Sequence, residues 1–228
     1  MKDKGTIMKL FLNAIIKFSL GVMLVGALIF LPAWTLDYPY GWLFMGLLFV
    51  PMFIAGIFML LKAPALLKRR LDVKEKQSAQ KGVIALSGLM FPLGFVLSAL
   101  DFRFSWSHVP VWLVVAASVL FVLGYILFAF VLVQNEYLSR TIKVEDGQRV
   151  VDTGLYGVVR HPMYLATLLM FLPMPLILGS LWGLIPFALY PVIIAVRILD
   201  EERLLTAKLS GYDEYKKKVK YRILPFIW

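Results

Sequence analysis

The chain has 228 residues, of which 61% are hydrophobic, and it carries a formal net charge of +10. So apolar a composition points to lipid as the surrounding solvent, and the charge then indicates attraction to anionic headgroups rather than to nucleic acid. With no cysteine, the chain can form no disulfide, thiolate metal site or cysteine nucleophile. Its two histidines, His108 and His161, lie far apart in sequence, so no metal site is predicted.

Four apolar runs are each long enough to cross a membrane, which takes about 20 residues. They are Leu10–Leu31, Gly41–Leu61, Gly82–Leu100 and Val109–Val133. The first run is too long for the apolar part of a cleavable signal peptide and lacks a small-residue cleavage site. We therefore expect it to be a true span.

The stretch Pro162–Val196 is long enough for two further crossings, but prolines and glycines interrupt it. Proline removes a backbone donor and bends a helix. We therefore predict a helical hairpin that turns near Leu178–Trp182, and its depth stays open. The predicted fold class is all-α, a polytopic transmembrane bundle of about six segments followed by a cytoplasmic C-terminal helix.

The basic residues predict the orientation of this bundle. Of 24 lysines and arginines, only Arg103 falls on the side opposite to the chain termini in the six-segment layout. Lys17 lies inside the first span, where its side chain can snorkel to the basic face. By the positive-inside rule, the basic side is cytoplasmic. Both termini and the region after the fourth span are then expected in the cytoplasm.

Polar and charged residues gather from Gln134 onward, around the start of the hairpin. Gln134-Asn135-Glu136 follows the fourth span directly, and Val150–Tyr156 predicts a short extended piece with a turn. Arg160-His161-Pro162-x-Tyr164 then opens the hairpin. Proline is well tolerated in a first helical turn, so His161 is expected near an N-cap. Such a helix start suits a carboxylate or phosphate.

A second charged group follows the hairpin, at Arg197 and at Asp200-Glu201-Glu202. Arg197 and Glu201 are four residues apart and share one face of a helix. Each of these residues, and His161 before its proline, also has an ordinary explanation as a membrane anchor, a solvated pair or a cap. Together they are harder to explain in this way, because ionisable groups at a membrane boundary are costly unless paired or used.

In their order and spacing these motifs resemble the isoprenylcysteine carboxyl methyltransferases and their prokaryotic relatives. The resemblance covers about Val133 to Trp228. Its anchors are Gln134-Asn135-Glu136, Gly154-x-Tyr156, Arg160-His161-Pro162-x-Tyr164, Glu201-Glu202-x-x-Leu205 and Tyr221-Arg222-x-x-Pro225. The eukaryotic enzymes have a Phe-Gly element three residues before a Tyr-x-x-Tyr, whereas Gly211 directly precedes Tyr212 here. The pattern is therefore more similar to the prokaryotic branch.

The resemblance implies a methyltransferase that uses S-adenosylmethionine, with no metal, and a lipophilic acceptor such as an isoprenylcysteine-like carboxylate. It implies Arg197 and Glu202 as the catalytic pair. The implied cofactor-binding residues are Gln134, Glu136, Tyr156, Arg160, His161, Tyr164, Glu201 and Glu202. Residues 1–133 would then be a four-helix membrane scaffold, and residues 134–228 a cofactor-binding and catalytic region, within one membrane domain.

The chemistry fits these residues independently. Methyl transfer from a sulfonium mainly needs positioning of donor and acceptor and exclusion of water. Arg197 can orient an acceptor carboxylate through its bidentate fork. Glu201 or Glu202 can bind the amino group of the donor or act as a base toward an amine acceptor.

Three alternatives stay open at this point. A phospholipid N-methyltransferase uses the same donor on an amine. Membrane sterol reductases share similar Arg-x-x-His-Pro and Tyr-Arg-x-x-Pro pieces and use NADPH. A transporter or scaffold is the non-enzymatic class, although the first four spans hold few of the polar groups that a coupled carrier places near the midplane. Membrane lipids and a lipophilic substrate are the expected partners, and the oligomeric state is open.

Overall fold

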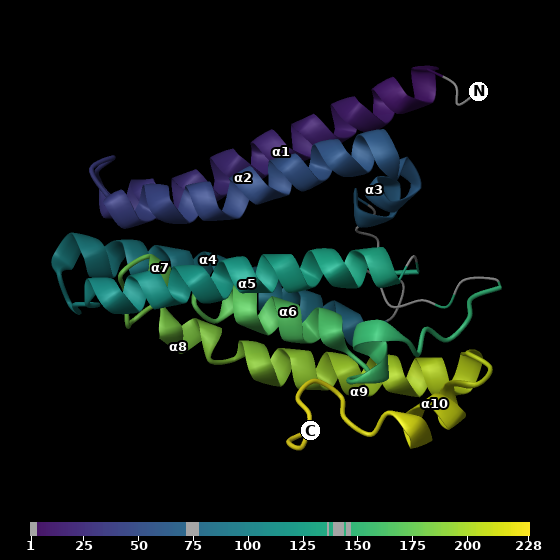
Figure 1. Ribbon diagram of the computed structural model, residues 1–228. Helices are drawn as coiled ribbons and strands as arrows, with labels where there is room; N and C mark the ends of the chain where they lie inside the picture. The colour runs from purple at the N-terminus through teal and green to yellow at the C-terminus, as the bar shows by residue number, and fades with distance from the viewer. Residues whose placement is uncertain (1–3, 72–77, 136, 139–143, 145–146) are drawn as a thin grey trace.

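The computed structural model describes residues 4–71, 78–135, 137–138, 144 and 147–228, and within these residues it is helical with no β-strand. Four helices are long and apolar enough to cross a membrane. They are α1 (Lys4–Ala33), α2 (Pro39–Lys62), α4 (Ser78–Phe104) and α5 (Val111–Gln134), and they lie lengthwise beside one another (Figure 1). The predicted all-α polytopic bundle is confirmed.

A short helix that the apolar pattern did not predict, α3 (Pro64–Leu71), follows α2. Its last residue, Leu71, accepts a hydrogen bond of 2.7 Å through its carbonyl oxygen from the Lys17 ammonium group. The Arg70 guanidinium lies 4.9 Å from the centre of the Phe128 ring on α5. Both positions are favourable for a cation, because the C-terminal end of a helix and the face of an aromatic ring each carry partial negative charge. Lys17 is thus held by α3 at this end of the bundle.

The predicted hairpin consists of four helical pieces, because its prolines and glycines interrupt the helix repeatedly. The pieces are α6 (Pro162–Phe171), α7 (Met174–Ile177), α8 (Leu184–Phe187) and α9 (Tyr190–Lys208). The chain turns between α7 and α8, at residues 178–183, as the sequence predicts. The long arm α9 continues well past Val196 and carries the second charged group.

The tip of the hairpin reaches the same end of the bundle as the α1–α2 and α4–α5 connections. Tyr38 in the first connection donates a hydrogen bond of 2.5 Å to the carbonyl oxygen of Leu178. The buried carboxylate of Asp101 near the end of α4 accepts hydrogen bonds from Ser180 (2.5 Å) and Ser107 (2.6 Å). The hairpin therefore runs the length of the bundle. We call this end, formed by residues 34–38, 105–110 and 178–183, the far end.

The hairpin packs closely against α5, and a glycine makes this possible. A Cβ atom at Gly124 would lie 2.6 Å from Cγ of Met170 and 3.0 Å from the carbonyl oxygen of Ala166. Only a residue without a side chain lets α5 and α6 approach so closely. This contact holds α6 alongside α5, and α9 in turn packs against α6.

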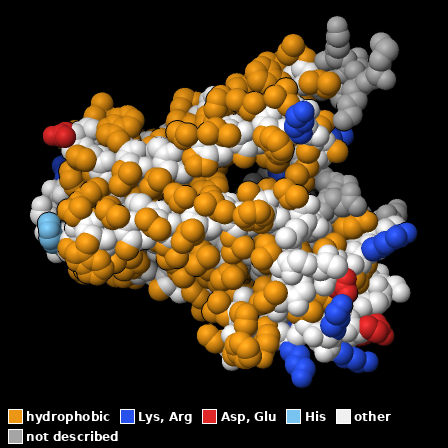
Figure 2. Space-filling view, viewed as in Figure 1, with side chains coloured by type: hydrophobic (Ala, Val, Ile, Leu, Met, Phe, Trp, Pro, Cys, Tyr) orange, Lys and Arg blue, Asp and Glu red, His pale blue; other side chains and the backbone are white. Residues whose placement is uncertain are grey.

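The opposite end, which we call the site end, carries the remaining structure. It holds a 3₁₀ helix, η1 (Gly154–Gly157), a last short helix, α10 (Tyr212–Lys218), and the tail 219–228. On the face drawn in Figure 2, lysine and arginine side chains gather at this end, whereas hydrophobic side chains cover the long helices. The charge asymmetry expected from the sequence is thus visible along the bundle.

Candidate active site

The site begins where α5 ends. The Gln134 side chain accepts a hydrogen bond of 2.9 Å from the backbone N–H of Leu155, and Asn135 donates one of 3.0 Å to the Tyr156 hydroxyl. Gly154 adopts a positive φ of 58°, and a Cβ there would lie 2.7 Å from Oε1 of Gln134. Glycine is therefore required at position 154 for its backbone conformation and for the close approach of Gln134. These contacts fasten η1 to the end of α5.

The residues that open α6 pair with the C-terminal tail. The N–H of Arg160 donates to the carbonyl oxygen of Tyr221 at 2.9 Å, and that of His161 donates to Arg222 at 2.8 Å. Pro162 then starts the helix with His161 as its N-cap, as predicted. The His161 side chain makes no capping hydrogen bond, because it faces α9 instead.

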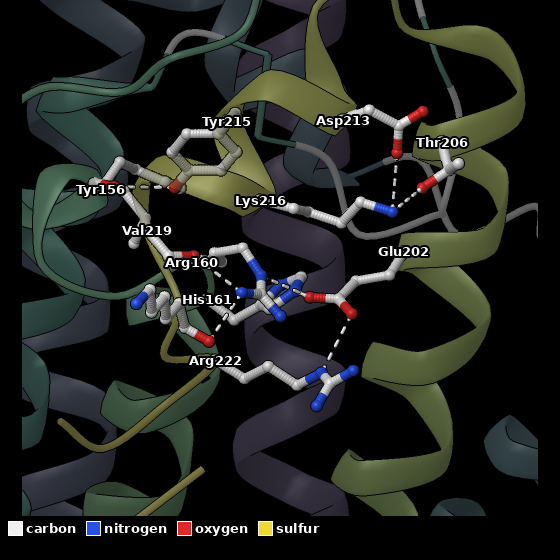
Figure 3. A network of polar contacts seen from close by, with 11 residues as sticks. Tyr156, Arg160, His161, Glu202, Thr206, Asp213, Tyr215, Lys216, Val219 and Arg222 are labelled. Atoms are coloured by element: carbon white, nitrogen blue, oxygen red, sulfur yellow. Dashed lines mark hydrogen bonds and ion pairs between the residues drawn. The ribbon is translucent and has the colours of Figure 1, made fainter. Parts of the chain in front are cut away.

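Three side chains converge on the carboxylate of Glu202 (Figure 3). Oε1 accepts a hydrogen bond of 2.7 Å from Nε of Arg160 and lies 3.2 Å from Nε2 of His161. Oε2 accepts one of 2.9 Å from Nε of Arg222. The carboxylate is therefore occupied on both oxygens, by the two residues that precede α6 and by Arg222 of the tail.

Electrostatics in this cluster keep Glu202 ionised. Burial raises its pKa, but the hydrogen bonds from His161, Arg160 and Arg222 outweigh burial and bring the pKa to about 2. Arg160 is fixed further, since it donates to the carbonyl oxygens of Val219 at 2.7 Å and Lys220 at 2.8 Å. This geometry suits a group that holds its neighbours in place.

A second polar group links α6 to α9. The Tyr164 hydroxyl donates to Oε2 of Glu201 at 2.5 Å and accepts a hydrogen bond of 3.0 Å from Nε of Arg197. Arg197 and Glu201 lie one helical turn apart on α9 and face the same tyrosine, as their spacing predicts. A cation and an anion are thus held at fixed positions on one wall.

Both polar groups border one open cavity at the site end. Among the predicted site residues, those that line it are Tyr156, Arg160, His161, Tyr164, Arg197 and Glu201. Two others do not: Gln134 is bonded to η1, and Glu202 lies behind Arg160 and His161. Glu136 falls outside the described residues. In the part of the chain that the structure describes, no three His, Cys, Asp or Glu side chains gather as a metal site.

Another part of the cavity lining, which we call the aromatic wall, is apolar and aromatic, and of its residues the sequence motifs included only Leu205. It includes Val150, Leu205, Leu209, Tyr212 and Tyr215. The Tyr215 hydroxyl donates to the carbonyl oxygen of Tyr156 at 2.7 Å, which holds α10 over η1 (Figure 3). The sequence does contain the pair Tyr212-x-x-Tyr215 directly after Gly211. The residues that these tyrosines contact in the fold are distant in sequence, so the pair alone did not predict a place in the cavity.

Comparison with known proteins gives a family model that matches part of this chain. Residues 112–212 match the family model described as phospholipid methyltransferase. The matched region runs from α5 to the start of α10, so it contains the cavity-lining residues named above except Tyr215. The match supports a membrane methyltransferase, and together with the four apolar helices it supports an integral membrane protein. The narrower resemblance to isoprenylcysteine carboxyl methyltransferases stays a prediction.

Two curated relatives are sterol reductases. The Delta(14)-sterol reductase TM7SF2 of Mus musculus is 36% identical over 92 residues, which is 39% of this chain and 22% of the relative. The Delta(14)-sterol reductase of Methylotuvimicrobium alcaliphilum is 26% identical over 152 residues, 60% of this chain and 36% of the relative. The chain therefore spans about a fifth to a third of the length of these relatives.

Proposed function

We propose that this protein is an integral membrane methyltransferase that binds S-adenosylmethionine in the cavity and methylates a lipophilic acceptor. The observation that carries the proposal is the position of the cavity. All of its lining residues except Tyr215 lie within the region that matches the phospholipid methyltransferase family, and they come from α6, α9, the start of α10 and the segment that follows α5. A soluble donor can then enter from the water side while a membrane-borne acceptor enters from the lipid.

The residues of the cavity fit the chemical groups of such a donor. Its amino-acid part carries an ammonium group that Glu201 would hold, and its nucleoside part would lie against the aromatic wall. When bound, S-adenosylmethionine supplies an electrophilic methyl group on a sulfonium. No side chain needs to form a covalent intermediate, so the task of the protein is positioning and exclusion of water.

Each residue of the charged wall then has a separate task. Arg197, oriented by the Tyr164 hydroxyl, would bind an anionic group of the acceptor. Arg160 and His161 would shape the donor side of the cavity, held there by Glu202. The sequence predicts Glu202 as catalytic; its contacts favour a positioning residue that acts through Arg160 and His161.

The division of the chain follows the same lines. All residues that line the cavity come from position 135 onward, which supports the proposal that residues 134–228 are the cofactor-binding and catalytic region and residues 1–133 the membrane scaffold. The basic site end would face the cytoplasm.

Because the chain holds no cysteine, single introduced cysteines test this orientation directly. An impermeant maleimide should label Lys217→Cys only from the cytoplasmic side and His108→Cys only from the other; the reverse pattern contradicts the orientation.

The acceptor, on this proposal, is a membrane lipid or lipid-like molecule with an anionic group beside the methylated atom. An isoprenylcysteine-like carboxylate satisfies this requirement, since Arg197 can bind the carboxylate itself. A phospholipid amine also satisfies it, because Arg197 can bind the phosphate group next to the amine. The family match favours the phospholipid, and the residue motifs favour the carboxylate.

A transfer assay separates these acceptors. The purified protein in nanodiscs is given donor labelled on its methyl group, with either phosphatidylethanolamine or S-farnesylcysteine. We expect label in one of the two, lost in Arg197→Gln and retained in Arg203→Gln, a matched change at an exposed position on the same helix. Equal transfer by both variants would show that Arg197 does not bind the acceptor. No transfer to any lipid, with no donor binding, would favour a transporter or scaffold.

A second candidate function is reduction of a lipophilic substrate with NADPH. The two sterol reductase relatives, which match 39% and 60% of this chain, favour it. Both candidates need a cavity for an adenosine-containing cofactor near the membrane. They differ in the cofactor that binds, which a direct binding measurement decides.

A further inference from the structure

Tyr212 occupies a distinctive place in the aromatic wall. It is the first residue of α10, directly after Gly211, whose φ of 83° turns the chain sharply away from α9. Its side chain lines the cavity, yet the residue is only 3% exposed. The turn therefore brings a bulky polar side chain back against the cavity and buries it there.

The hydroxyl of Tyr212 has no hydrogen-bond partner among the residues that the structure describes, and no other buried side-chain nitrogen or oxygen there shares this property. A buried tyrosine hydroxyl normally finds a partner, because an unsatisfied buried polar group costs free energy. The site end holds three other buried tyrosines, and each has one. Tyr156 is bonded to Asn135, Tyr164 to Glu201, and Tyr215 to the Tyr156 carbonyl.

The surroundings of Tyr212 are suited to a flat apolar group. It belongs to a buried cluster with Leu209, Tyr215 and Val219, against which Val150 and Leu205 also pack. Ligand sites typically combine such walls with a few placed polar groups that fix orientation. A heteroaromatic base attached to a sugar has the matching chemistry, a flat apolar face with hydrogen-bonding atoms at its edge.

The Tyr212 hydroxyl stays neutral and can therefore donate as well as accept. Burial raises its pKa, and the nearby carboxylates of Glu202 and Glu201 raise it further, whereas Arg160 lowers it less. A neutral phenol in this position can bond a ring nitrogen, an amine or a sugar hydroxyl. Glu201 and Arg197 line the same cavity.

We propose that the aromatic wall is the subsite for the nucleoside half of the bound donor, and that the Tyr212 hydroxyl hydrogen-bonds to it. The inference rests on the proposed function in so far as the donor is S-adenosylmethionine, and it adds the side chain that fixes the nucleoside by a hydrogen bond. The nucleoside lies against Tyr212, Leu205 and Leu209, and the amino-acid part lies toward Glu201.

Stability without ligand tests the first half of the inference. Tyr212→Phe removes a hydroxyl that has no partner in the fold, so the variant should unfold at the same or a higher temperature than the wild type. The matched control is Tyr125→Phe, which removes a hydroxyl bonded at 2.7 Å to the carbonyl oxygen of Leu48 and should unfold at a lower temperature. If Tyr212→Phe loses as much thermal stability as the control, the hydroxyl serves the fold and the inference fails.

Ligand binding tests the second half. The probes are S-adenosylhomocysteine and 5′-methylthioadenosine, which lacks the amino-acid part. Tyr212→Phe should weaken both by the same factor, about threefold to tenfold, as expected for loss of one hydrogen bond. Tyr125→Phe should bind both like the wild type. Unchanged affinities in Tyr212→Phe, or a loss for S-adenosylhomocysteine alone, would overturn the nucleoside subsite.

Failure of the proposed function has a different signature. It appears in the wild type, as binding of NADPH with no binding of S-adenosylhomocysteine. In that case the same comparison of Tyr212→Phe with the wild type, made with NADPH and with adenosine, decides the subsite. A wild type that binds none of these adenosine compounds would overturn the proposed function and the subsite together.

Discussion

Glu202→Gln tests the cluster that holds the cavity in shape. The change keeps the size of the side chain but removes the charge that Arg160, His161 and Arg222 share. The pKa of Glu202 lies at about 2 against an ordinary 4.5. At about 1.4 kcal/mol per pH unit, this difference corresponds to about 3 kcal/mol of folding stability at neutral pH. Since Glu202 is only 7% exposed, solvent screens little of its interaction with the three cationic partners. We therefore expect the free energy of unfolding of Glu202→Gln to be lower than that of the wild type by about 3 kcal/mol.

The assay is thermal or denaturant unfolding in detergent, compared with Glu214→Gln, which alters an exposed carboxylate on α10. The pH dependence gives a second check. A carboxylate with a lowered pKa stabilises the fold above its unfolded pKa and loses this effect as pH falls through the folded pKa. The gap between wild type and Glu202→Gln should therefore close between about pH 4.5 and pH 2. Equal stability of the two proteins at neutral pH, or a stability difference that stays constant between about pH 4.5 and pH 2, would refute the reasoning.

Three further predictions concern other parts of the molecule. Tyr164→Phe removes the hydroxyl between Arg197 and Glu201, so kcat in the transfer assay should fall by about 10-fold to 100-fold with intact folding by circular dichroism. Asp101→Asn weakens the hydrogen bonds that anchor the hairpin tip, and unfolding should show a loss of about 2 kcal/mol while donor affinity stays unchanged. Gly124→Val forces α5 away from α6 and should cost about 1–3 kcal/mol in the same unfolding assay; wild-type stability would contradict the close contact.

The long helices could be predicted because their signal is local. The run Leu10–Leu31 lies inside α1 (Lys4–Ala33), and Val109–Val133 overlaps nearly all of α5. Span length and hydropathy act over neighbouring residues, so one sequence suffices to find them. The hairpin turn followed in the same way from its prolines and glycines. The short, charged α3 has no comparable signal and was missed.

The depth of the hairpin and the roles within the site depend on contacts between distant residues. The bonds of Tyr38 and Asp101 to the tip, which is distant in sequence, show that the hairpin runs the length of the bundle. The second oxygen of Glu202 is occupied because Arg222, twenty positions later, reaches back to it. The spacing of Arg197 and Glu201 on one helix predicted their shared face, whereas no periodicity connects Tyr212 with the cavity.

The central claim is that the cavity binds a methyl donor, and calorimetric titration of the wild-type protein tests it most directly. The purified protein in nanodiscs is titrated with S-adenosylhomocysteine and, separately, with NADPH. Our account predicts saturable binding of S-adenosylhomocysteine that is lost in Glu201→Gln but kept in Glu214→Gln, and no binding of NADPH. Saturable binding of NADPH without binding of S-adenosylhomocysteine would contradict it.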